Sequence, residues 1–169
     1  MEFKVGDQVV HPKYGVGYVV KLEEREFEPG VMRQYYEISI LGTTLWVPLD
    51  LPALGLRKLT VKSEISRCRK ILESHPLPLA EDSRLRQSDL STRLNKGTIM
   101  AHCEVVRDLY AYVKHKPWSG TIASFLQVSQ DVLCQEWAIV EGIDLSAAVV
   151  EVGSLLEKSR LIVMSEAAA

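Results

Sequence analysis

The chain has little of what a secreted, membrane-spanning or DNA-coating protein needs. Cysteine is scarce: Cys68, Cys103 and Cys134 are odd in number and far apart, which favours a reducing compartment over a disulfide framework. No apolar run approaches the ~20 residues that cross a bilayer, and no signal-like segment opens the sequence, so we expect a cytoplasmic protein without membrane contact. The net charge of -2 argues against a globally basic protein but does not exclude a local basic patch.

The sequence also lacks a convincing catalytic or metal-binding pattern. His102 and Cys103 are adjacent, but neighbouring helical residues point about 100° apart, and Cys103 lies on an apolar stripe typical of a core position. No C-x₂-C or H-x₃₋₅-H pair occurs that would suit zinc. The pair Gly15 and Gly17 lacks the third glycine and the following helix of a dinucleotide-binding loop. We therefore expect no enzyme activity, no cofactor and no small-molecule substrate.

Residues 1–60 are predicted to fold as a small β-module. Stretches rich in β-branched and aromatic residues alternate with turn signals at Pro12, Gly30, Gly42 and Pro48. These stretches are residues 9–10, 16–27, 34–41, 43–47 and 56–59. They predict a small five-stranded antiparallel barrel. Because a core of this size is marginal, we expect a second module to support it.

From residue 63 the apolar period changes from about 2 to about 3.6, which is typical of helices. Helices are expected over residues 63–73, 83–96, 98–114, 119–142 and 144–156, with an extended proline-containing linker at 75–79. The sequence therefore predicts an α+β fold in two modules. The barrel at 1–60 precedes an all-α bundle of about five helices at 61–160, and 161–169 is expected to be a flexible tail.

Three sequence motifs point to a known family. They are Phe3-Lys4-Val5-Gly6-Asp7-Gln8-Val9-Val10-His11-Pro12-Lys13-Tyr14-Gly15, then Val47-Pro48 followed by Gly55-Leu56-Arg57, and finally Glu104-Val105-Val106-Arg107-Asp108-Leu109. In this order and spacing they resemble the CarD-like family of bacterial transcription regulators, over about residues 2–156. The resemblance implies a Tudor-like barrel that binds the RNA polymerase β subunit, followed by a helical module near promoter DNA.

The last of these motifs has a structural interpretation. At helical spacing, Val106 and Leu109 fall on the apolar stripe and are expected in the core. Glu104, Arg107 and Asp108 are expected to face outward. We interpret the motif as a packing and helix-pairing element and not as a binding site.

The second strand is the candidate protein-binding edge. From Lys21 to Phe27 it carries charges on both faces, which is typical of an edge strand guarded against unwanted pairing, although a merely solvated strand has the same pattern. The resemblance implies that the polymerase-binding residues are Arg25, Glu26 and Phe27 on this strand and Trp46 on the fourth. Relatives often carry arginine at the Trp46 position, and Trp46 could also be a core residue.

The helical module carries a local excess of basic residues. Between residues 84 and 116 the bases are Arg84, Arg86, Arg93, Lys96, Arg107, Lys114 and Lys116, against Asp89, Glu104 and Asp108. Arg86, Arg93 and Lys96 are seven and ten residues apart along one predicted helix and so share a face. We predict a weak, sequence-independent contact with DNA phosphates through Arg84, Arg86, Arg93 and Lys96. A solvated helix face is the alternative.

One position departs from the family. Many relatives place a tryptophan, proposed to wedge into the minor groove, where this chain has Ser83. Serine has no apolar group that could unstack a base step. Leu85 could insert weakly or could equally be a core residue, and the place of Trp118 beside the DNA cannot be judged from sequence. We expect a monomer that binds the polymerase, with two interpretations of its function. It is either a regulator that modulates open-complex stability through upstream-fork DNA, or an adaptor whose helical module recruits another regulator.

Overall fold

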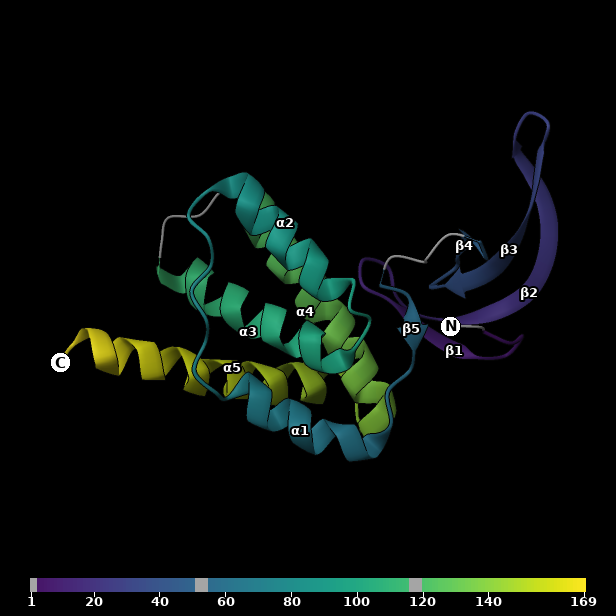
Figure 1. Cartoon of the computed structure of the whole chain (residues 1–169). Helices are drawn as coiled ribbons and strands as arrows, with labels where there is room; N and C mark the ends of the chain where they lie inside the picture. Colours follow the sequence, from purple (N-terminus) through teal and green to yellow (C-terminus); the bar gives the residue numbers. More distant parts are fainter. Residues whose placement is uncertain (1–2, 51–54, 116–119) are drawn as a thin grey trace.

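The computed structural model describes residues 3–50, 55–115 and 120–169, and Figure 1 shows within them a β-sheet module followed by a helical module. The strands are β1 (Gln8–His11), β2 (Gly15–Glu28), β3 (Val31–Ile40), β4 (Thr43–Pro48) and β5 (Arg57–Lys58). The helices are α1 (Lys62–Leu72), α2 (Ser83–Leu94), α3 (Ile99–His115), α4 (Gly120–Glu141) and α5 (Leu145–Ala167). The predicted order of strands and helices is confirmed.

The five strands form one antiparallel sheet in the order β4-β3-β2-β1-β5. The long strand β2 is shared: its first residues pair with β1, from His11 opposite Gly15 to Gln8 opposite Tyr18, and most of its length pairs with β3. At Gly17 a Cβ atom would lie 2.4 Å from the Ser39 carbonyl oxygen, so only glycine allows this close approach of β2 to β3. The apolar face of the sheet encloses Phe3, Val9, Val19, Tyr36, Ile38, Ile40, Val47 and Leu56.

The helical module has a core built mainly by α1, α3, α4 and α5. Its largest fully buried side chains include Trp137, Leu109 and Leu133. All three cysteines are free and buried, which confirms the core position of Cys103. Helix α2 contributes less to this core than the other helices do, because Leu90 is its one buried residue. None of the helices in the described residues is long and apolar enough to cross a membrane.

Helix α5 is longer than expected. It continues to Ala167, beyond the predicted helix end at residue 156 and through most of the predicted tail. Figure 1 shows this end of α5 extending past the other helices. The extension has a sequence basis, since no proline or glycine follows Gly153 to stop the helix. The flexibility of residues 161–169 stays a prediction.

A buried ionic network connects α2 and the segment after α1 to α3. The Asp108 carboxylate accepts hydrogen bonds from the Leu77 backbone N–H at 2.9 Å, from Arg107 Nε at 2.8 Å and from Arg93 Nη2 at 2.6 Å. Arg107 Nη1 also donates to Ser74 Oγ at 2.8 Å. The prediction that Arg107 and Asp108 face outward is therefore wrong. Both are buried, because each supplies the opposite charge that the other needs away from water.

His102 is buried near the contact between the two modules. Its Nε2 lies 2.8 Å from the Ser129 carbonyl oxygen. Burial, together with the nearby Arg57 charge, lowers the pKa of His102 to about 4. In the unfolded chain this pKa is about 6.5, so the unfolded state takes up the proton first as pH falls. We therefore expect the free energy of unfolding to drop by about 3 kcal/mol between about pH 6.5 and about pH 4.

Urea unfolding at several pH values measures this dependence. His102→Gln removes the titrating group and is expected to flatten part of the pH slope, because glutamine keeps a donor for the Ser129 carbonyl. Burial also lowers the pKa of His11 to about 4, and hydrogen bonds lower the pKa of Glu23, so part of the slope is expected to remain. A His102→Gln protein with the full pH dependence of the parent would contradict the assignment.

Candidate protein and DNA interfaces

The outer edge of β2 is free of neighbouring strands over most of its length. Strand β1 pairs with β2 only as far as Tyr18, and the Val19 backbone bonds to Gly6 and Asp7. Between Val19 and Glu28, β2 pairs with β3 along one side, and no strand among the described residues pairs with its other side. Figure 1 shows the β2–β3 hairpin extending away from the helices. Its unpaired backbone N–H and C=O groups are therefore available to another strand.

One face of the hairpin carries a stack of cationic and aromatic side chains. Alternate residues of a strand share a face, so Arg25 and Phe27 point the same way. The Arg25 guanidinium lies 3.9 Å from the centroid of the Trp46 ring, and the Phe27 ring lies 6.1 Å from it. Tyr35 completes the group, with its ring 4.9 Å from Phe27 in an edge-on arrangement. We call Arg25, Phe27, Tyr35 and Trp46 the aromatic stack.

Charged neighbours hold the stack in place. Glu23 accepts a hydrogen bond from Arg25 and lies 2.6 Å from Lys21 Nζ, and Lys21 also reaches Glu37 at 3.2 Å. Hydrogen bonds from Lys21 and Arg25 lower the pKa of Glu23, and the bond to Glu23 raises the pKa of Lys21. Glu23 and Trp46 together orient the Arg25 guanidinium, whose side chain is 42% exposed. The Arg25 guanidinium is thus held in one orientation while its charge stays accessible to solvent.

Three of the four residues predicted to bind the polymerase are therefore brought together. Glu26 lies on the opposite face of the hairpin, where its Oε1 accepts from the Gly30 N–H at 2.6 Å. Trp46 is half-buried beneath Arg25. Sequence reasoning missed Tyr35 and Lys21. The alternation along β2 could have indicated Lys21, which shares its face with Arg25 and Phe27.

The four residues predicted to bind DNA do not form one free cationic face. Arg84 and Lys96 are exposed. Arg86 is half-buried, its Nη1 donates to the carbonyls of Ala80 and Glu81 at 2.9 and 3.0 Å, and its guanidinium lies 5.2 Å from the Tyr112 ring centroid. The Arg93 side chain is 13% exposed and is bound to Asp108. Arg86 and Arg93 share a helix face, as predicted, but that face is turned toward α3.

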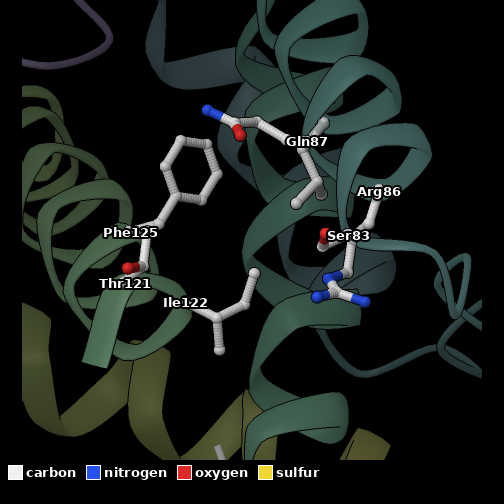
Figure 2. A pocket seen from close by; sticks show the side chains of 7 residues that line it. Ser83, Arg86, Gln87, Thr121, Ile122 and Phe125 are labelled. Carbon is white, nitrogen blue, oxygen red and sulfur yellow. The ribbon is translucent and has the colours of Figure 1, made fainter. Parts of the chain in front are cut away.

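The start of α2 borders a cavity. Asp82 caps the helix by accepting from the N–H groups of Arg84 and Leu85, both at 2.9 Å. Leu85 is 66% exposed and is not a core residue. Figure 2 shows the cavity, of about 220 Å³, between α2 and α4; its lining is Ser83, Arg86, Gln87, Leu90, Thr121, Ile122 and Phe125. Lys116 and Trp118 lie outside the described residues.

Comparison with known proteins supports the motif assignment. Residues 3–60 match the CarD-like/TRCF RID domain, and residues 67–152 match the CarD C-terminal domain. YdeB of Bacillus subtilis (strain 168), which is named as a candidate transcription factor, is 29% identical over 149 residues. That match covers 83% of this chain and 94% of YdeB. Both modules and their order agree, and the chain therefore belongs to the CarD-like family of transcription factors.

Proposed function

We propose that this protein regulates transcription by binding the RNA polymerase β subunit through the free edge of β2. The observation that carries the proposal is the uncovered backbone of β2 beside the aromatic stack. Strand addition would use backbone hydrogen bonds for affinity, and the oriented Arg25 and Trp46 side chains would give specificity. Such an interface is small, below ~1,200 Å², so a second contact on the same complex is expected to supply part of the affinity.

The second contact is proposed to be with DNA near the upstream edge of the open promoter. Arg84 and Lys96 are the exposed cations of the predicted set, so few phosphates would be neutralised. The salt slope would then be about -2, typical of a weak, sequence-independent contact. A contact made only in the open complex shifts the closed-to-open equilibrium by its differential affinity, and ~1–3 kcal/mol corresponds to roughly 5- to 150-fold.

A double charge reversal tests the DNA contact. Arg84→Glu with Lys96→Glu is expected to shorten open-complex lifetime about 5-fold or more, since it replaces attraction to phosphates by repulsion. Lifetime is measured by competitor challenge at several salt concentrations, and polymerase binding is measured in parallel. The matched control is Arg67→Glu with Lys70→Glu on the exposed surface of α1, which is expected to leave the lifetime unchanged.

An adaptor role is the second candidate function. It is favoured by one observation: two of the four predicted DNA-binding cations, Arg86 and Arg93, are engaged within the protein. The same experiment separates the two functions. An adaptor would keep polymerase binding, show no salt-dependent protection of upstream DNA, and be insensitive to the Arg84→Glu/Lys96→Glu double reversal.

A further inference from the structure

The two modules are joined by a buried ion pair. Arg57 of β5 donates from Nη1 to Glu136 Oε1 at 2.6 Å and from Nη2 to Glu136 Oε2 at 2.5 Å. The Thr60 backbone N–H donates to the same Oε1 at 2.9 Å. Glu136 lies in the C-terminal part of α4 and is fully buried, and Arg57 is 6% exposed. We call Arg57, Thr60 and Glu136 the joint.

The geometry of the joint suits orientation better than stabilisation. Two parallel N–H···O bonds between planar groups fix both the distance and the rotation of one group against the other. Removing both charges from water is costly, and hydrophobic replacements of similar volume are often as stable as a buried ion pair. The ion pair is therefore weak evidence for stability, but it specifies one arrangement of β5 on α4.

Two glycines of the family motifs lie where the β-module meets the helices, beside the joint. A Cβ atom on Gly15 would lie 2.4 Å from Gln135 Oε1 of α4. A Cβ atom on Gly55 would lie 2.7 Å from Pro12 Cγ and 3.4 Å from the Leu94 carbonyl oxygen at the end of α2. Both glycines have positive φ, +96° and +78°, which side chains rarely adopt. The Gln135 atom is the end of a flexible side chain and Pro12 belongs to the β-module itself, so the positive φ is what requires glycine at both positions. Both residues lie away from the free part of the β2 edge.

We propose that Arg57 and Glu136 are positioning residues that hold the β2 edge and helix α2 at a fixed angle. The proposal rests on the proposed function, in which β2 binds the polymerase and α2 meets DNA. A rigid link gives the second contact a high effective concentration once the first is made. A loosened joint lowers that concentration without removing a residue from either interface. The joint thereby determines how well polymerase binding is converted into open-complex stabilisation.

The test is the double variant Arg57→Met with Glu136→Leu, because either single change would leave a buried charge unpaired and unfold the protein. Polymerase binding is expected to stay within about 2-fold and the protein to stay folded, with some loss of urea stability because the Thr60 N–H loses its acceptor. The gain in open-complex lifetime is expected to fall about 5-fold or more. Spin labels at Glu28→Cys and Ser154→Cys, both exposed, report the angle between modules, since the native cysteines are buried. The distance distribution is expected to broaden.

The control removes a solvent-exposed ion pair away from the joint, Lys158→Met with Glu73→Leu, and is expected to change neither readout. An Arg57→Met/Glu136→Leu protein with a narrow parental distance distribution overturns the proposal, as does one with a broadened distribution but a parental lifetime. Failure of the proposed function itself is distinguishable: the parent protein would then not bind the polymerase at all, while the label distances would still report whether the joint fixes the angle.

Discussion

Arg25→Glu is expected to weaken binding to the RNA polymerase β subunit by about 30-fold or more, with the fold unchanged. Arg25 lies in the aromatic stack, next to the free edge where a partner strand would pair. The reversal removes the cation over the Trp46 ring and places a carboxylate beside Glu23. The oriented cation that is proposed to give specificity is thereby lost. Pull-down or titration with the isolated β subunit measures the loss, and circular dichroism checks the fold.

The matched control is Arg67→Glu, the same reversal at an exposed position of α1. It is expected to bind the β subunit as the parent does. If Arg25→Glu binds the β subunit normally, the binding site must lie elsewhere. The next candidate is then the outer edge of β4, the end strand of the sheet. Because α2 and the joint are untouched by Arg25→Glu, the variant isolates the first contact from the second.

The strands and helices could be predicted because their signals are local. Alternation along β2 is enough to place Arg25 and Phe27 on one face and Glu26 on the other. The position of Trp46 depends on two registers, β2 on β3 and β3 on β4, which bring Glu37 opposite both Lys21 and Trp46. Such non-local registers are not contained in any single stretch of sequence. Trp46 was predicted as a binding residue only through the resemblance to the family, and neither that resemblance nor any local pattern pointed to Tyr35.

The predicted DNA-binding face shows a second limit. Spacing by seven residues says that Arg86 and Arg93 share a side of α2, but not whether that side meets solvent or another helix. Charged residues are assigned to solvent by default. Here that assignment fails because Asp108, far along the chain on α3, pairs with Arg93. The same pairing explains why Asp108 itself is buried, which its own motif did not indicate.

Removing the Asp108 carboxylate is expected to destabilise the helical module strongly. Asp108→Ala leaves the buried Arg107 and the largely enclosed Arg93 without their shared counter-charge, and the Leu77 N–H without its acceptor. Breaking a buried ion pair in this way costs about 3–5 kcal/mol, more than a small module can readily lose. Helix α2 depends on this network because Leu90 is its one buried residue. Urea unfolding followed by helix ellipticity measures the loss of free energy of unfolding.

Asp89→Ala provides the matched control for the same arginine. Asp89 lies 3.5 Å from Arg93 Nη1, but its side chain is 55% exposed, so its ion pair is screened by water. We expect its removal to change the free energy of unfolding by less than about 0.5 kcal/mol. Similar losses for the two variants would mean that Arg93 is held by its own helix. A large difference would show that α2, and with it Arg84 and Lys96, is positioned by Asp108 on α3.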